Sequence, residues 1–246
     1  MDPTDDVRAR LVRARRVCVL TGAGMSAESG IPTFRDAMTG LWARFDPADL
    51  ASEAGFRADS GRVWDWYAER RDGVRRAEPN AGHRALAAFA ARRPGVLTLV
   101  TQNVDDLHQR AGNVDAIQLH GDIGVDRWLE PCRCRPACTP DAARPGRPPR
   151  CAGCGVLARP GVVWFGENLP VGALAAAQQA AAACEVMLVV GTSGAVWPAA
   201  GLAGRARAAG AFVVIVNPHD SDIDAEAELR LRGTAAHMLP ALLDPP

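Results

Sequence analysis

The stretch VCVLTGAGMSAESGIPTFR, residues 17–35, joins an apolar run to a loop of glycine and other small residues. The run VCVLTG (17–22) resembles the strands of parallel sheets, which are buried on both faces. Gly22 and Gly24 follow it directly, and glycines there let backbone N–H groups approach a diphosphate at a helix N-terminus. An ordinary tight turn explains the same spacing equally well. The stretch therefore predicts a strand and a turn, but does not assign a ligand by itself.

Three further apolar runs end in polar residues or glycine: VLTLVTQN (96–103), VMLVVGTS (186–193) and AFVVIVNP (211–218). Segments with helical patterning lie around them, at residues 5–16, 80–92, 172–184 and 198–209. This alternation predicts an α/β fold, a Rossmann-like parallel sheet with helices on both faces. Ligands of such sheets bind beyond the C-terminal ends of the strands. We expect the polar residues that end the runs to converge there: Thr21, Gln102, Asn103, Thr192, Ser193 and Asn217.

Two stretches do not fit the sheet and predict a second, smaller domain. Residues 31–79 carry aromatic side chains in helical patterning, and residues 121–160 are rich in cysteine, proline and arginine. The Rossmann-like sheet domain would then comprise residues 1–30, 80–120 and 161–246. Ordinary dinucleotide-binding folds carry an acidic residue on a second strand, about 20 positions after the glycines. Here the predicted lobe follows the glycines instead, so no second strand carries that residue. This argues against a standard dehydrogenase.

Composition narrows the class of partner. The chain has 246 residues, 48% of them hydrophobic, and a formal net charge of zero, so no global field favours nucleic acid or an anionic membrane. All 28 basic residues are arginine. The N-terminus fails as a signal peptide, and no apolar stretch reaches the roughly 18 residues of a membrane span. We expect a soluble, cytoplasmic protein and a monomer.

Five of the seven cysteines crowd into residues 132–154, which in a reducing compartment suggests metal binding rather than disulfides. Cys151 and Cys154 form a C-x-x-C pair, half of a tetrahedral zinc site. The other half would come from two of three residues, and the spacing leaves the choice open: Cys132, Cys134 and Cys138. Free thiols are the alternative. A site closed by four thiolates would be structural, because it has no open coordination position for chemistry.

Several longer motifs occur in an order that resembles the sirtuins, the NAD-dependent protein lysine deacylases. They are GAGMSAESGIPTFR (22–35), TQNVDDLHQRAG (101–112), IQLHG (117–121), CAGC (151–154), RPGVVWFGE (159–167), GTS (191–193) and VN (216–217). The resemblance spans about residues 17–240, nearly the whole chain. One departure concerns zinc, because Trp128 occupies the position where the family's first cysteine pair normally begins.

The resemblance implies that loops at the strand ends hold NAD as a co-substrate. The loop around the diphosphate and nicotinamide ribose would include Gly22, Ala23, Gly24, Glu28, Phe34 and Arg35. Arg35 is suited to pair with phosphate, although a solvated surface charge is the alternative. The nicotinamide and ribose would meet Gln102, Asn103 and Asp105, and the adenosine half would meet Gly191, Thr192, Ser193, Asn217 and Ala235.

His120, in the sequence LHG, matches the family's general base. An imidazole suits this role because its ordinary pKa lets it accept a proton at neutral pH. The resemblance implies that the acyl-lysine oxygen displaces nicotinamide from the ribose and that His120 then removes a ribose hydroxyl proton, with Asn103 and Asp105 assisting. The products would be free lysine, nicotinamide and O-acyl-ADP-ribose. The segment VVWFGE (162–167) would pair with the substrate peptide through Val163, Trp164, Phe165 and Gly166, unless it is a buried strand.

The stretch WDWYAERR (64–71) contains Tyr67, the only tyrosine, and Arg70 three positions on, which places both on one face of a helix. They match the Tyr-x-x-Arg pair of the sirtuin branch that prefers succinyl and malonyl groups. A distal acyl carboxylate would bond both heads, whereas an acetyl group would leave them unpaired. The alternative is an aromatic core helix with a solvated arginine. GTSGAVWPAA (191–200) also resembles this branch, with Trp197 where tyrosine is common.

Three other functions remain open at this stage. Two use the same NAD site, namely a deacetylase with broad acyl tolerance and an ADP-ribosyltransferase. The third is a non-catalytic module that binds peptide or senses NAD. His120, Asn103 and Asp105 argue against the third, because a pure binder has no use for a base beside a ribose.

Overall fold

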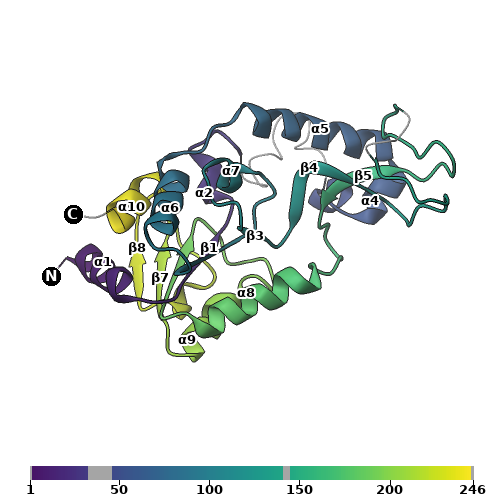
Figure 1. Ribbon diagram of the computed structural model, residues 1–246. Coiled ribbons are helices and arrows are strands. Elements are labelled where there is room, and N and C mark those ends of the chain that lie inside the picture. The colour runs from purple at the N-terminus through teal and green to yellow at the C-terminus, as the bar shows by residue number, and fades with distance from the viewer. Residues whose placement is uncertain (1, 33–45, 141–144, 245–246) are drawn as a thin grey trace.

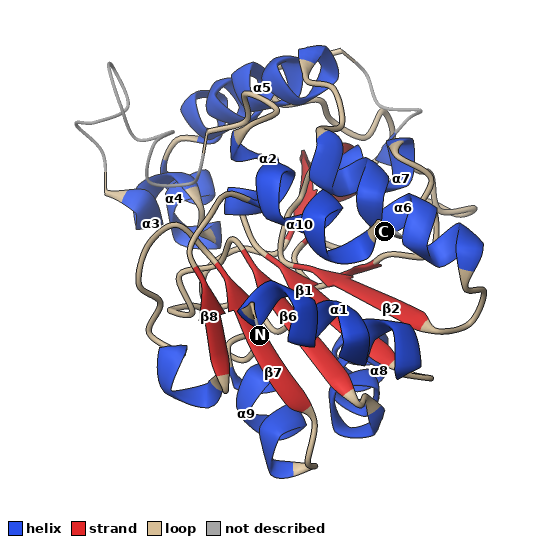
Figure 2. Ribbon diagram, turned by 90° about the vertical axis from the view of Figure 1, so that its left-hand side faces the viewer, coloured by secondary structure: helices blue, strands red, loops and turns tan. Residues whose placement is uncertain are grey.

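The computed structural model describes residues 2–32, 46–140 and 145–244. Its centre is a parallel sheet of six strands in the order β3-β2-β1-β6-β7-β8 (Figure 2). The strands are β1 (Val17–Thr21), β2 (Leu97–Thr101), β3 (Ile117–Gln118), β6 (Val186–Val190), β7 (Phe212–Val216) and β8 (Leu229–Leu231). Four of them correspond to the four predicted runs. The short edge strands β3 and β8 were not predicted, because two or three residues give no readable pattern.

Helices cover both faces of the sheet, as Figure 2 shows. On one face α1 (Pro3–Arg13), α6 (Ala81–Arg92) and α10 (Ala235–Leu243) enclose a core with alternate strand residues. On the other face α8 (Val171–Ala183) and α9 (Gly201–Ala208) enclose a second core. The predicted N-cap of α6 is confirmed, since the Asn80 side chain accepts from the N–H groups of Gly82 and His83. The predicted fold class is confirmed.

A second layer lies beyond one end of the sheet (Figure 1). It consists of α3 (Pro47–Leu50), α4 (Glu53–Ala58), α5 (Ser60–Arg76) and a two-stranded antiparallel sheet of β4 (Gly121–Trp128) and β5 (Ala158–Val162). These elements bury their own apolar cluster, which includes Phe56, Trp66, Tyr67, Ile123 and Trp164. Three short elements complete the described chain: α2 (Gly24–Ala27), α7 (Leu107–Arg110) and the 3-10 turn η3 (Asp224–Glu226).

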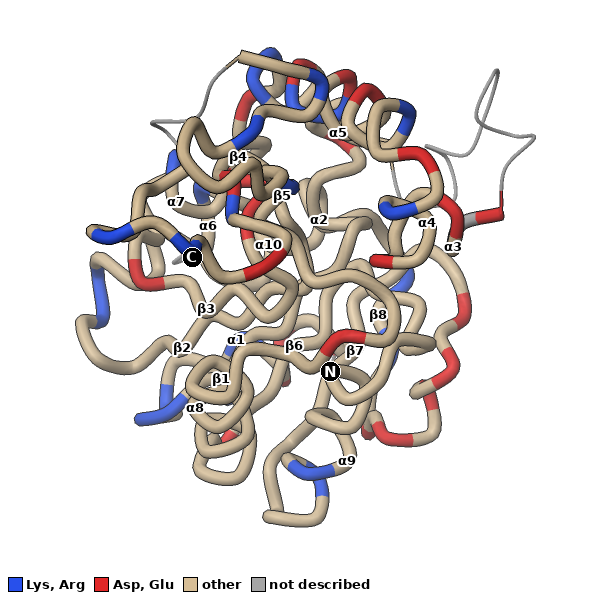
Figure 3. The backbone as a smooth tube through the Cα atoms, turned by 90° about the vertical axis from the view of Figure 1, so that its right-hand side faces the viewer, with Lys and Arg blue, Asp and Glu red and all other residues tan. Residues whose placement is uncertain are grey.

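Charges of both signs are interspersed over the chain, and α5 alone carries several of each (Figure 3). Most of the ion pairs lie at the surface, where each contributes at most about 1 kcal/mol to stability. None of the helices in the described ranges combines the length and the apolar character that crossing a membrane requires.

Candidate active site

The C-terminal ends of the central strands are level with one another. Thr21 of β1 pairs in register with Thr101 of β2 and with Val190 of β6, and Val190 pairs with Val216 of β7. The residues that follow therefore start at one edge of the sheet: Gly22, Gln102, Gly191 and Asn217. Two side-chain hydrogen bonds to Thr192 connect the loops at this edge. Gln102 Nε2 donates to Thr192 Oγ1 at 3.0 Å, and Asn217 Nδ2 donates to the Thr192 carbonyl at 2.9 Å.

The glycines at this edge pack backbone against backbone. A Cβ on Gly24 would lie 2.8 Å from Gly191 Cα, and one on Gly191, whose φ is +61°, would lie 2.6 Å from Met25 N. The Gly24 N–H donates to the Gly191 carbonyl at 2.8 Å, and the Gly22 N–H donates to the Val190 carbonyl at 2.9 Å. These two N–H groups are thus bonded within the protein, and the role of the loop toward a diphosphate stays a prediction. The glycines are needed because two strand-end loops approach too closely for a side chain.

Asn103 and Asp105 are buried beside this edge, 7% and 5% exposed. Asn103 Nδ2 donates to Ser26 Oγ at 3.1 Å, and its backbone N–H donates to Thr101 Oγ1 at 3.0 Å. Asp105 Oδ1 accepts from the Leu107 N–H at 3.1 Å. Burial raises the pKa of Asp105, and hydrogen bonds from Leu107 and Ser26 oppose that rise. The predicted strand-end residues are thus held rigidly by bonds within the protein.

His120 follows β3 at the same edge and is half-buried. Its Nδ1 lies 2.8 Å from the Gln102 carbonyl oxygen. A carbonyl only accepts, so in the neutral ring Nδ1 carries the proton and Nε2 is left with its lone pair. Burial lowers the pKa of His120, and the bond to Gln102 opposes this in part. His120 is therefore neutral at pH 7, with a proton acceptor fixed at Nε2.

Three buried polar residues that sequence reasoning did not single out belong to this network. Ser26 Oγ lies 3.5 Å from His83 Nε2, and His108 Nε2 lies 3.1 Å from Thr21 Oγ1. The two imidazole rings are 4.8 Å apart, centroid to centroid. Burial lowers the pKa of His83 to about 4 and that of His108 to about 3, so both are neutral at pH 7. The sequence could have indicated these residues, because each is a polar residue within a helix or motif whose other residues are typical of buried positions.

The remaining residues of the predicted cofactor loop lie in different surroundings. Ala23, Glu28 and Ser193 are exposed at the edge, and Glu28 Oε2 accepts from the Ala236 N–H at 2.9 Å. Ala235 is packed in the core at 3% exposure, so its methyl group is not on the surface. Phe34 and Arg35 lie outside the described residues. The roles of these residues toward a cofactor stay predictions.

Tyr67 and Arg70 lie on α5, as the pattern predicted, and face the second layer. Tyr67 is 5% exposed, and its hydroxyl accepts from Trp164 Nε1 at 3.0 Å. Arg70 Cζ lies 4.6 Å from the centroid of the Trp66 ring, and its Nη1 is shielded from solvent. Burial lowers the pKa of Arg70, whereas Tyr67 and Asp105 are close enough to oppose this. The alternative of an aromatic core helix is met in part, since Trp66 and Tyr67 lie in the apolar cluster, while Arg70 is half-buried instead of fully solvated.

Residues 163–166 follow β5 and are not a buried strand of the main sheet. The side chains alternate, since Trp164 is 2% exposed and Phe165 is 53% exposed. The Val163 N–H donates to the His120 carbonyl and the Phe165 N–H to the Ala51 carbonyl, both at 2.8 Å. The Trp164 side chain therefore packs inside the protein while that of Phe165 is exposed, and the pairing of residues 163–166 with a peptide stays a prediction.

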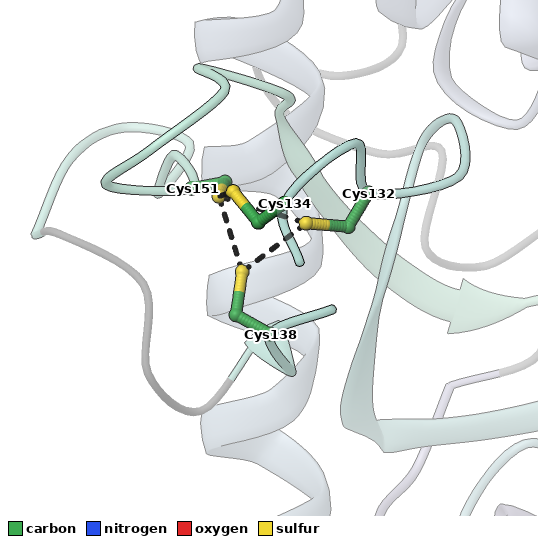
Figure 4. Close-up of side chains that lie close together, drawn as sticks. All are labelled: Cys132, Cys134, Cys138 and Cys151. Carbon is green, nitrogen blue, oxygen red and sulfur yellow. Dashed lines mark hydrogen bonds between the residues drawn. The ribbon is translucent and has the colours of Figure 1, made fainter. Parts of the chain in front are cut away.

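Five thiols meet in the long connection between β4 and β5. Four of them form a group whose sulfurs all lie within 4.8 Å of one another: Cys132, Cys134, Cys138 and Cys151 (Figure 4). Zinc bound at about 2.3 Å by four thiolates places the sulfurs about 3.8 Å apart, and the sulfur of Cys151 lies 3.8, 3.4 and 3.1 Å from those of Cys132, Cys134 and Cys138. The cluster fits a structural zinc ion.

The fifth thiol, Cys154, has its sulfur 3.7 Å from that of Cys132 and is not in the four-thiol group. The expected C-x-x-C half-site therefore enters this group only through Cys151. Trp128, which stands in the place of a family cysteine, donates its indole N–H to the Cys138 carbonyl at 2.6 Å. It supports the loop that carries a thiol instead of supplying one.

Comparison with known proteins identifies the family that builds this site. The model of the Sir2 family matches residues 22–198. The chain belongs to the Sir2 family. This Sir2 chain is 57% identical over 236 residues to a protein of Ralstonia nicotianae named NAD-dependent protein deacylase, covering 96% of this chain and 94% of that one.

Solved structures of Sir2 proteins share the fold. A Sir2 homologue in complex with NAD is 40% identical, with a TM-score of 0.87, and the match covers 97% of this chain and 92% of that one. Sir2Tm bound to a propionylated peptide is 29% identical, with a TM-score of 0.82, covering 96% and 95% of the two chains. The predicted sirtuin resemblance is confirmed.

Proposed function

We propose that this Sir2 protein removes acyl groups from protein lysines with NAD as co-substrate, and that it prefers acyl groups ending in a carboxylate. The first part is supported by family membership and by the relative from Ralstonia nicotianae, which is named an NAD-dependent protein deacylase. It is also supported by the neighbours that hold NAD and a propionylated peptide.

The residues at the strand ends are suited to hold NAD. Gln102, Asn103 and Asp105 would face its nicotinamide ribose, and the segment Gly191–Ser193 with Asn217 would face its adenosine half. When bound, NAD supplies a ribose carbon from which nicotinamide departs. The rigid bonds among these side chains mean that little ordering is required on binding, which favours a defined orientation.

The observation that carries the assignment of a base is the bond between His120 Nδ1 and the Gln102 carbonyl. It leaves Nε2 as the acceptor, and the lowered pKa keeps that acceptor free of a proton at neutral pH. The neighbouring Val163, bonded to the His120 carbonyl, ties the base to the segment that would receive the peptide.

The acyl preference is supported by Tyr67 and Arg70. Burial raises the pKa of Tyr67 to about 12, so the phenol keeps its proton and acts as a donor. A phenol and a guanidinium together offer only N–H and O–H groups to a substrate, which suits a carboxylate. Each bond to a charged group contributes roughly 1.5–3 kcal/mol, which corresponds to about ten- to a hundredfold in selectivity.

A panel of matched lysine peptides tests the proposal. Acetyl, propionyl, malonyl and succinyl forms of one peptide are incubated with NAD and the zinc-containing protein, and nicotinamide release is followed. We expect release that depends on the peptide, with kcat/KM for the succinyl form at least about tenfold above that for the acetyl form. Equal values would refute the preference. Transfer of labelled ADP-ribose to protein, or binding without release, would refute deacylation.

A further inference from the structure

The only tyrosine of the chain receives a hydrogen bond from a tryptophan 97 residues away. Trp164 Nε1 donates to Tyr67 Oη at 3.0 Å, and both residues are buried. An indole N–H can only donate, so the phenol oxygen must act as the acceptor in this bond. The hydroxyl proton of Tyr67 is therefore turned toward some other group. The position of the indole N–H therefore limits the directions in which the Tyr67 hydroxyl can donate.

The indole is itself held tightly from several sides. The guanidinium carbon of Arg159 lies 3.2 Å from the centroid of the Trp164 ring, and the Phe56 ring lies 5.2 Å from it, centroid to centroid. Arg159 is 2% exposed and pairs with Glu167 at 2.5 Å. Glu167 Oε2 in turn accepts from the Trp164 backbone N–H at 2.8 Å. Ring and backbone of Trp164 are thus fixed by the same ion pair.

This arrangement joins the proposed base to the proposed acyl-binding pair. Val163 bonds to the His120 carbonyl at 2.8 Å through its N–H, and the next residue, Trp164, bonds to Tyr67 through its side chain. Two consecutive residues therefore set the position of the phenol relative to the imidazole. Because the imidazole and the phenol are held by neighbouring residues, their separation is well defined, which suits discrimination between acyl chains by length and terminal group.

We propose that Trp164 is a specificity-determining positioning residue, which directs the Tyr67 hydroxyl proton, together with the Arg70 guanidinium, toward the acyl carboxylate. This inference rests on the acyl preference proposed above. Because Trp164 occupies the acceptor side of the phenol, the pair presents donors only. A terminal carboxylate satisfies such donors, whereas a terminal carboxamide brings N–H groups against them.

The test compares Trp164→Phe, which keeps an aromatic ring but removes the N–H, with Tyr67→Phe and the double variant. We expect Trp164→Phe to lower the succinyl-to-acetyl ratio of kcat/KM by about three- to tenfold, mainly through KM for the succinyl peptide, as the loss of one neutral hydrogen bond requires. The double variant should lose no more than Tyr67→Phe alone, because both changes remove one coupled unit. A succinamyl peptide, with a neutral carboxamide, should be rejected less by Trp164→Phe than by the parent protein.

A packing control separates this role from a structural one. Val74→Ala disturbs the same apolar cluster about two helical turns from Tyr67 on α5, without touching the hydrogen bond or the rings that hold the indole. It should lower the melting temperature while leaving the succinyl-to-acetyl ratio unchanged. Equal losses for both peptides in Trp164→Phe, or additive losses in the double variant, would overturn the inference. If the parent protein prefers succinyl peptide and Trp164→Phe keeps the ratio, only this inference fails, whereas a parent without preference removes the proposed acyl selectivity as well.

A measurement on the unaltered chain covers the case in which Trp164→Phe does not fold. Since the chain has one tyrosine, a carbon-13 label on the tyrosine ring carbon bonded to oxygen gives a single resonance. We expect this resonance to shift on addition of the succinyl peptide and to stay in place with the succinamyl peptide. Identical shifts with both peptides would show that the phenol does not distinguish the carboxylate, and would overturn the inference.

Discussion

His120 Nδ1 and the carbonyl oxygen of Gln102 are 2.8 Å apart, and this contact determines which nitrogen of the ring remains basic. Gln102 directly follows β2, and its N–H donates to the carbonyl of Thr21, the last residue of β1, at 2.9 Å. The base is therefore oriented by the backbone of the sheet. A backbone carbonyl cannot be removed by substitution at Gln102, so the tautomer should survive changes to that side chain.

The first prediction concerns the imidazole itself. His120→Ala should abolish removal of every acyl group while leaving the melting temperature close to that of the parent, because the ring is half-buried and makes one hydrogen bond among the described residues. His219→Ala, at an exposed histidine, is the control and should retain activity. Because burial lowers the pKa of His120 below 6.5, kcat/KM should stay level near neutral pH and fall only at more acidic pH. Turnover by His120→Ala, or a loss of rate above pH 6.5 as pH is lowered, would contradict the assignment.

The second prediction concerns Arg70. Arg70→Met keeps a long apolar stem over Trp66 but removes the charge. We expect desuccinylation to fall at least about tenfold and deacetylation to fall far less, because only the succinyl group loses a charged hydrogen bond. Kinetics on matched acetyl and succinyl peptides measure this. Parallel losses on the two peptides would assign Arg70 to packing alone.

The third prediction resolves the zinc ligands. Cys151 is central to the four-thiol group, so Cys151→Ser should lose zinc, whereas Cys154→Ser should keep one zinc per chain. Metal analysis of the purified variants gives the answer. Loss of zinc in Cys154→Ser, with retention in Cys134→Ser, would instead show that the C-x-x-C pair binds as a unit. A chelator should lower the melting temperature of the parent protein, because the ion stabilises the folded state.

The fourth prediction concerns the close approach of two loops. Gly191→Ala adds a Cβ only 2.6 Å from Met25 N at a φ of +61°, and should lower the free energy of unfolding by about 2–4 kcal/mol. Gly73→Ala is the matched control, since its Cβ meets nothing within 4 Å on helix α5. That change should raise the free energy of unfolding by about 0.5–1 kcal/mol. Urea unfolding compares the two, and equal effects would rule out backbone contact as the reason for Gly191.

The fifth prediction follows from the buried histidine pair. His83 and His108 have pKa values of about 4 and about 3 in the folded protein, below the ordinary 6.5. The unfolded chain therefore binds more protons as pH falls below 6.5, and stability is lost from there down toward the folded values. Between pH 7 and about pH 5 each histidine should remove about 2 kcal/mol. Urea midpoints across this range measure the loss, and His108→Asn should flatten the curve; a parent curve that is already level would contradict the burial of neutral rings.

The sequence by itself determined the four central strands of the sheet, four of the helices that cover it, and the family. Continuous apolar runs such as residues 186–190 can only be buried strands or short buried helices, and their flanking glycines and polar residues settle the choice. His120 and the Tyr67–Arg70 pair were found because each lies in a contiguous motif. The cysteines were found because metal ligands cluster in sequence as well as in space.

Tertiary structure alone decided how those residues are used. Trp164 reads as part of a peptide-binding segment, yet its side chain is buried and bonded to Tyr67, 97 residues away. The sequence around Gly24 is typical of a phosphate-binding turn, and only the fold shows that Gly24 packs on Gly191. Five cysteines read as candidate ligands, but only their positions in space separate four from the fifth. Local pattern encodes burial and backbone conformation, whereas the partner of a polar group is chosen by segments distant in the chain that meet only on folding.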